Sequence, residues 1–154
     1  MRAIFYSPMV KPDGAAASGA QRMCALLQRA LAVADVEVLS PDLPRTYEGR
    51  GDRAAQLAFK QASERAAEAL IRTYDRAARP DLCFSYHVYY KSPDWIGPAV
   101  SRALGIPYVI AEGSHAPKRA GGPWAVGHDG TTAALKTADR LFAMTRFDRV
   151  CLDQ

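Results

Sequence analysis

Polar and charged residues directly follow an apolar run within segment 105–124 of this sequence. The run itself, residues 106–111, has the length and the β-branched content of a buried strand. The eight positions after it contain a carboxylate, a hydroxyl, an imidazole and two cations: Glu112, Ser114, His115, Lys118 and Arg119. Open α/β sheets bind ligands outside the carboxyl ends of their strands, so this segment is a candidate site. A charged, solvated loop is the alternative interpretation.

These residue types suit proton transfer and anion binding. An imidazole or a carboxylate can act as a general base toward a hydroxyl group, so His115 and Glu112 are the candidate catalytic residues. Lys118 and Arg119 could hold phosphate charge on a ligand, because charged donors form the stronger hydrogen bonds to phosphate. Ser114 lies between the two catalytic candidates and is a further candidate for substrate contact.

A loop near the N-terminus could also contact a ligand. The spacing of Gly14 and Gly19 resembles a phosphate-binding loop, but Ala20 and Gln21 stand where that motif has lysine and Ser or Thr. Small residues at a helix start still let a ligand approach the backbone N–H groups, so both glycines are candidate binding residues. A flexible loop of small residues is the alternative.

Histidine and aromatic residues follow the third apolar run. His87, like His115 and His128, lies at or beyond the carboxyl end of a predicted strand and is a candidate binding residue. Tyr89 belongs to an aromatic segment that could stack on sugar rings, although packing of a helix on the sheet, which we assign to Trp95, is the commoner role. No histidine or cysteine pair has the spacing of a metal site, so we expect no bound metal.

Composition limits the class of protein. The chain has 154 residues, 49% of them hydrophobic, which suits one core and not two ordinary domains. The net charge of +4 is modest and the arginines are scattered, so we expect no nucleic-acid partner; a phosphorylated ligand or peripheral contact with an anionic membrane fits equally well. Cys24 and Cys83 lie in apolar patterns, which is typical of reduced thiols in a cytoplasmic protein. We expect neither a signal peptide nor a membrane-spanning helix.

Strand-like and helix-like segments alternate along the chain. Short apolar runs predict strands at 3–6, 36–39, 82–86, 107–111 and 141–144. Helical patterns lie between them, at about 19–34, 52–78, 92–104 and 131–138. We therefore predict one α/β domain over 1–154: a Rossmann-like, doubly wound, mainly parallel sheet of at least five strands with helices on both faces.

Local signals predict several helix ends. Ser18 and Gln21 have the pattern of a capping box, and Asp52 is expected to cap the second helix. The run 92–94, Ser-Pro-Asp, predicts a capping serine, a proline at the first helical position and an acid near the positive end of the helix dipole. Gly105 predicts the end of that helix. A last helical signal runs into Gln154, which fits either a natural end or a truncation.

The order of these segments resembles the N-terminal domain of family 4 glycosyltransferases of the GT-B fold. The resemblance covers essentially the whole chain and rests on the helix start at 19–22, on 103–111 (Ala-Leu-Gly-Ile-Pro-Tyr-Val-Ile-Ala) and on 138–143 (Ala-Asp-Arg-Leu-Phe-Ala). It implies an enzyme that transfers a sugar from a nucleotide-sugar co-substrate to an acceptor, without a metal or other cofactor. This domain would supply the acceptor side, and its partner would be a C-terminal donor domain of the same chain with a Glu-x7-Glu motif.

The resemblance leaves two catalytic candidates and one alternative function. Many members have a histidine directly after the fourth strand; here Glu112 follows that strand and His115 comes later in the same loop. The alternative is a non-catalytic α/β module that binds a ligand or regulates a partner. An open reading frame that continues into a second domain with Glu-x7-Glu would favour the transferase.

We expect this chain to fold alone but to transfer no sugar, because catalysis requires the donor to be held opposite the acceptor. Circular dichroism and thermal unfolding check the first expectation, and release of nucleoside diphosphate from a panel of nucleotide-sugars checks the second. Turnover of any nucleotide-sugar by the purified chain would contradict the interpretation as half of an enzyme.

Overall fold

A computed structural model describes residues 1–10, 18–76 and 79–152 of the chain. Five parallel strands form one sheet in the order β2-β1-β3-β4-β5. The strands are β1 (Arg2–Tyr6), β2 (Glu37–Leu39), β3 (Leu82–Val88), β4 (Tyr108–Gly113) and β5 (Arg140–Phe142). The helices are α1 (Gly19–Val33), α2 (Arg53–Arg76), α3 (Ile96–Leu104), the 3-10 turn η1 (Pro117–Arg119), α4 (Ala125–Thr137) and α5 (Arg146–Leu152). This arrangement confirms the predicted Rossmann-like α/β fold.

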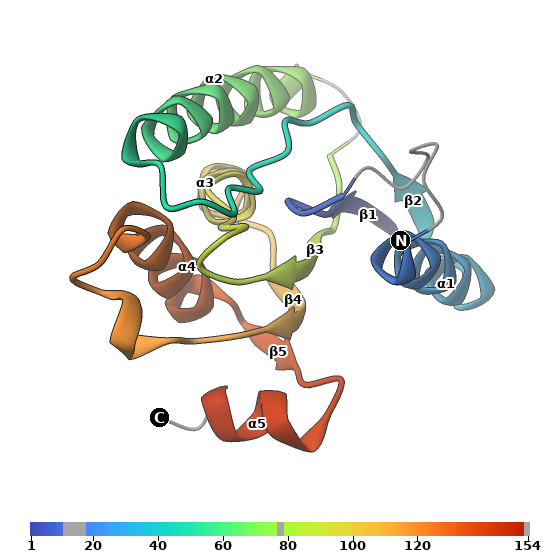
Figure 1. The fold of residues 1–154 in the computed structure, drawn as a ribbon. Coiled ribbons are helices and arrows are strands. Elements are labelled where there is room, and N and C mark those ends of the chain that lie inside the picture. Colours follow the sequence, from blue (N-terminus) through green and yellow to red (C-terminus); the bar gives the residue numbers. More distant parts are fainter. Residues whose placement is uncertain (11–17, 77–78, 153–154) are drawn as a thin grey trace.

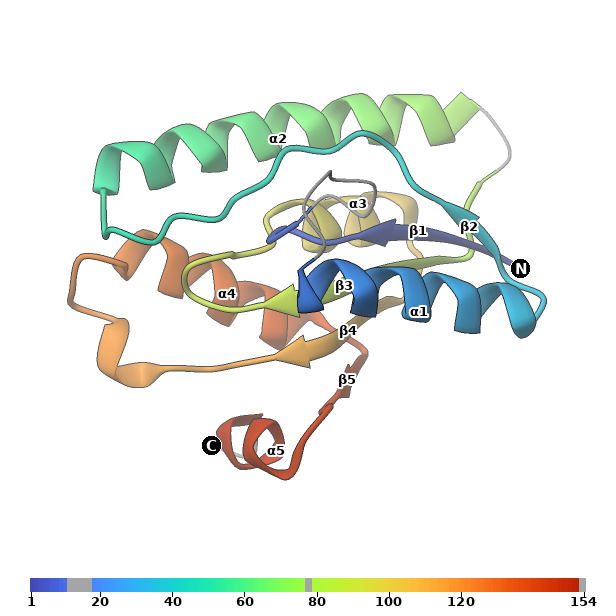
Figure 2. The same cartoon turned by 45° about the vertical axis from the view of Figure 1, so that its right-hand side comes forward.

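Helices cover both faces of the sheet (Figures 1 and 2). On one face Phe5 and Phe84 stack with ring centroids 5.6 Å apart and pack with the buried Cys24 of α1. On the other face the alternate strand residues, such as Ile110, pack against α2, α3 and α4. Each large apolar side chain buried in this way stabilises the fold by roughly 1.5–3 kcal/mol.

The strand order reverses beside β1, and this reversal locates the ligand crevice. The chain moves from β1 to β2 on one side and then returns past β1 to β3 on the other. Sheets of this order bind ligands in the crevice outside the carboxyl ends of the two strands at the reversal. Here those strands are β1, which ends at Tyr6, and β3, which extends past His87.

Three strands and one helix are longer than the sequence predicts, and β1 begins one residue earlier, at Arg2. β3 and β4 each continue two residues beyond the predicted ends at Tyr86 and Ala111, because backbone pairing holds Val88 against Gly113 whatever the polarity of the intervening side chains. α4 begins at residue 125, not at 131. The sequence predicts this start too late, because glycines in the first turns interrupt the apolar pattern of a helix. Those glycines serve close packing: an added Cβ at Gly127 would collide with the carbonyl oxygen of Tyr90.

Three of the predicted helix ends are confirmed. The capping box joins Ser18 and Gln21 through hydrogen bonds in both directions. The carboxylate of Asp52 accepts hydrogen bonds from two backbone N–H groups of the first turn of α2, at 2.8 and 3.1 Å. Gly105 ends α3 with a left-handed φ of 60°, a conformation that glycine adopts without steric cost.

The prediction that Ser92 caps α3 is wrong, because the helix begins at Ile96 after Trp95 at the N-cap, and the side chain of Asp94, one residue earlier, accepts the hydrogen bonds of the first turn. One Asp94 carboxylate oxygen accepts hydrogen bonds from the backbone N–H groups of Ile96 and Gly97, both at 2.8 Å. The other oxygen accepts from the Ser85 hydroxyl of β3 at 2.5 Å and from the Tyr108 hydroxyl of β4 at 2.6 Å. The side chain is completely buried, so these four donors replace its hydration.

Trp95 also departs from its predicted role. It packs against α4, where an added Cβ at Gly130 would collide with its indole ring, and not against the sheet. The next residue, Ile96, takes the place toward the sheet and is 2% exposed.

We expect Asp94→Ala to lower the free energy of unfolding by more than about 3 kcal/mol, because it leaves four buried donors without an acceptor. Ser92→Ala is the matched control. The Ser92 hydroxyl is buried without a hydrogen-bond partner, so its loss should cost less than about 1 kcal/mol. Urea unfolding of both variants measures the difference; equal losses would contradict the assignment of Asp94 as the cap.

Candidate functional site

The residues next to the crevice have an unusual backbone conformation. Tyr86 pairs with Ala111 and Val88 with Gly113, so His87 and Glu112 lie at the same level on neighbouring strands. Both have left-handed φ values, 64° for His87 and 61° for Glu112. This conformation costs a non-glycine residue about 1–3 kcal/mol and is concentrated at functional sites.

The left-handed turn changes the direction of the side chains along β3. Val88 is fully buried in the core beneath α2, α3 and α4, the same side as Cys83. If the side chains alternated regularly along β3, Val88 would lie on the same side as Tyr86, which packs toward α1. The turn at His87 therefore lets the imidazole contact the ring of Tyr86 edge-on, at a centroid distance of 5.5 Å.

His87 and Glu112 form a half-buried pair. His87 Nδ1 lies 3.6 Å from Glu112 Oε1, within ion-pair range but too long for a hydrogen bond. The His87 side chain is 24% exposed and that of Glu112 is 29% exposed, so a ligand could reach both. Burial raises the pKa of Tyr86, and the hydrogen bond and charge of Glu112 raise it further, which keeps Tyr86 protonated as a donor to this carboxylate.

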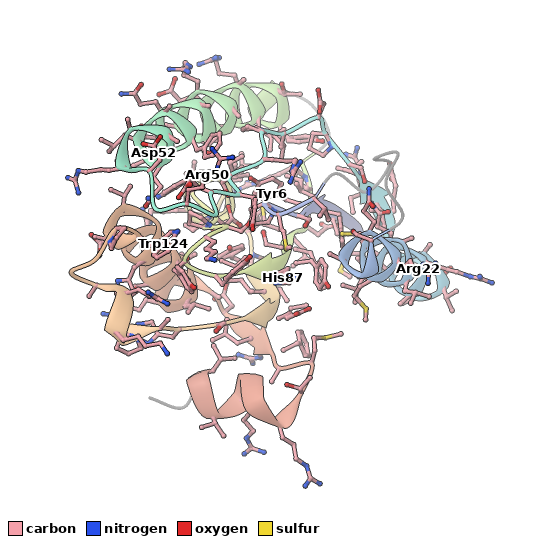
Figure 3. The ribbon with its side chains drawn as sticks, viewed as in Figure 1. Tyr6, Arg22, Arg50, Asp52, His87 and Trp124 are labelled. Atoms are coloured by element: carbon pink, nitrogen blue, oxygen red, sulfur yellow. The ribbon has the colours of Figure 1, made fainter. Side chains whose placement is uncertain are left out.

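A chain of aromatic contacts leads from this pair to the start of α4. The rings of His87 and Tyr89 lie 5.1 Å apart, those of Tyr89 and Tyr90 5.6 Å apart, and those of Tyr90 and Trp124 also 5.6 Å apart. Burial, followed by the neighbouring tyrosines, raises the pKa of Tyr89 to about 12, so its hydroxyl stays protonated at neutral pH. Figure 3 labels His87 beside β3 and Trp124 at the start of α4.

The residues predicted from the sequence fall into separate groups. Glu112, His87 and Tyr89 lie together at the carboxyl edge of the sheet. His115 lies instead against His128 of α4, with ring centroids 5.5 Å apart. Ser114 extends the ladder by donating its backbone N–H to the carbonyl of Val88 at 3.0 Å.

The remaining candidates are dispersed. Arg119 turns its guanidinium over the rings of Tyr90 and Trp124, whereas Lys118 is exposed. Gly19 is exposed at the start of α1, with open space where a Cβ would lie. Gly14 lies outside the described residues.

Two members of this region, Lys91 and Trp124, were not predicted from the sequence, whereas Tyr86 and Tyr90 belong to the aromatic segment expected at the end of the third strand. A signal existed for Lys91, since it stands in the same segment as His87. No local signal linked that segment to Trp124, because the contact depends on how α4 packs beside the end of β3.

A separate hollow of about 320 Å³ lies between α2 and α4. It is lined by Leu57, Lys60, Trp95, Val126, Asp129, Gly130 and Ala133. None of the residues predicted to bind or react lines it, and its surface is largely apolar, so we assign the candidate site to the edge of the sheet.

Within the described part of the chain, no cluster of three or more histidine, cysteine, aspartate or glutamate side chains could hold a metal ion. No helix in those ranges is both long enough and apolar enough to cross a membrane. No model of a known protein family matches the chain, and no curated protein matches it.

The contact between the two histidines predicts a pH effect on stability. Burial lowers the pKa of His115 from its ordinary value of 6.5, and the neighbouring His128 and Lys136 lower it further. The folded protein thus binds this proton less readily than the unfolded chain. Stability present above about pH 6.5 is therefore lost as the pH falls toward the pKa of the folded state.

We expect His115→Gln to reduce this acid sensitivity. Between about pH 7.5 and pH 5.5, the melting temperature should fall less in the variant than in the unaltered protein, as measured by scanning calorimetry. An equal fall in both proteins would show that His115 titrates alike in the folded and unfolded states, against the packing described above.

Proposed function

We propose that this chain is the acceptor-side domain of a glycosyltransferase, in which His87 and Glu112 act on the acceptor hydroxyl. The observation that carries the proposal is the strained His87–Glu112 pair at the carboxyl edge of β3 and β4. The resemblance of segments 103–111 and 138–143 to family 4 enzymes of the GT-B fold supports the sugar-transfer chemistry.

The pair has the parts that a general base needs. A carboxylate beside one imidazole nitrogen favours a proton there, which leaves the other nitrogen free to accept a proton from a hydroxyl group. The Nδ1 atom of His87 is buried and has no hydrogen-bond partner, so a small movement toward Glu112 would complete the contact. Catalytic hydrogen bonds are often long before the substrate binds and shorten in the complex.

Neighbouring groups would position the acceptor. The Tyr89 ring lies beside the imidazole and offers a face on which a sugar or other ring could stack. The donor nucleotide-sugar would be held by a second domain, and the proposal requires no metal or other cofactor. The free, buried thiols of Cys24 and Cys83 fit a reducing, cytoplasmic location.

The test compares His87 with His115 in the protein encoded by the natural gene, with a panel of nucleotide-sugars as donors. We expect His87→Asn and Glu112→Gln each to lower turnover by about 10²-fold with little change in melting temperature. The double variant should lose little more, because the two residues act as one unit.

His115→Asn is the matched control for His87→Asn, since it makes the same chemical change at the competing histidine. A loss of turnover in this variant alone would return the catalytic role to His115. If the unaltered protein shows no measurable transfer and the variants lose ligand binding, the non-catalytic binding module would be favoured instead.

A further inference from the structure

Two cations share the pair of aromatic rings at the far end of the aromatic chain. Lys91 Nζ lies 5.9 Å from the ring centroid of Tyr90 and 5.1 Å from that of Trp124. The guanidinium carbon of Arg119 lies 5.2 and 5.0 Å from the same two centroids. The negative faces of the rings hold both cations in place, although such contacts contribute only about 0.5–2 kcal/mol each.

No described carboxylate neutralises these cations. Among the residues that the structure describes, no carboxylate oxygen lies within 4.0 Å of Lys91 Nζ or of the Arg119 guanidinium. The nearby Glu48 is occupied, because its two oxygens accept hydrogen bonds from the backbone N–H groups of Arg50, Gly51 and Asp52. Among the described residues, the two positive charges are therefore held together without a carboxylate in ion-pair contact with either of them.

Arg119 also has an unsatisfied donor. Its Nε atom is buried and has no hydrogen-bond partner in the structure. A buried donor without an acceptor costs about 1–3 kcal/mol, and an anionic oxygen would remove that cost. Arginine is well suited to this role, because its planar guanidinium can bind two phosphate oxygens at once.

The surrounding backbone favours the same kind of ligand. Trp124 is the N-cap of α4, so the positive end of this 13-residue helix points into the region. The indole N–H of Trp124 donates to the carbonyl of Glu48 at 3.3 Å, which fixes the ring against the turn before α2. Figure 3 labels Trp124, Arg50 and Asp52 in this neighbourhood.

We propose that Lys91 and Arg119, held by Tyr90 and Trp124, bind a phosphate group of the acceptor. The assignment of this phosphate to the acceptor rests on the proposed function. The inference then names the chemical class of that acceptor: a molecule that carries a phosphate monoester or diester. Tyr89 lies between the phosphate site and His87, so one ligand could contact both.

The site is tested by calorimetric titration of the chain with inorganic phosphate and with pyrophosphate. We expect Arg119→Gln and Lys91→Gln each to weaken binding by about 10-fold or more. Lys118→Gln is the matched control, because Lys118 belongs to the same loop but is exposed and contacts neither ring. An equal loss in all three variants would indicate diffuse charge attraction and would overturn the proposal.

A second measurement needs no variant. The chain has two tryptophans, so each indole N–H gives a separate NMR signal. Phosphate should shift the signal of Trp124 and leave that of Trp95 in place, since Trp95 lines the hollow between α2 and α4. No shift of the Trp124 signal, together with no heat of binding, would overturn the phosphate site.

Vesicles distinguish a lipid headgroup from a free phosphorylated molecule. If the phosphate belongs to a lipid, phosphatidylcholine vesicles with added phosphatidic acid should bind the chain more tightly than pure phosphatidylcholine vesicles, because the choline cation balances the charge of the phosphatidylcholine phosphate. Binding of pyrophosphate alone would identify a water-soluble acceptor, and either result supports the phosphate site.

The variants His87→Asn and Glu112→Gln separate this inference from the proposed function. Both should retain phosphate binding, because neither residue contacts Lys91 or Arg119. Phosphate binding without sugar transfer by the natural protein would support the phosphate site and contradict the transferase function. Sugar transfer without phosphate binding would support the transferase function and contradict the phosphate site.

Discussion

A fully buried carboxylate organises the part of the molecule that carries the candidate site. Asp94 has no accessible surface, and a charge in that position is tolerated only when donors replace its lost hydration. Those donors come from α3 and from two neighbouring strands, through Ser85 in β3 and Tyr108 in β4. Burial raises the pKa of Tyr108, and the charge of Asp94 raises it further, so its hydroxyl remains a donor. The bonds fix β3 and β4 relative to each other on the N-terminal side of the pair, two residues before His87 and four residues before Glu112.

Rigid packing on both sides allows the strain at this pair to persist. Two non-glycine residues with left-handed φ are unfavourable alone, but the backbone pairs before and after them continue the ladder. Val88 is completely buried directly after His87, and Gly113, directly after Glu112, faces the Leu135 side chain closely. The core therefore offsets the cost of the turn, and the turn brings an imidazole and a carboxylate to the accessible edge of the sheet.

The aromatic residues after β3 connect that edge to a second region of different chemistry. At one end the rings border an acid–base pair, and at the other end they hold two cations without a neutralising carboxylate among the described residues. Tyrosine and tryptophan rings have few rotatable bonds, so they separate the two regions by a fixed length. A ligand with a hydroxyl at one end and an anionic group at the other matches this division better than a simple apolar molecule.

Local sequence patterns suffice to predict the fold class, the five strands and the helix ends at Ser18, Asp52 and Gly105, because these depend on residues within a few positions of one another. They also indicate that Glu112 and His87 share an edge, since parallel strands end on the same side. The contact of Glu112 with His87, and not with His115, could not be predicted in this way, because strand register and two left-handed residues set that distance. The same holds for Asp94 as the cap of α3 and for the meeting of Lys91 with Arg119. These contacts join residues on different elements, and their geometry depends on packing that no local pattern contains.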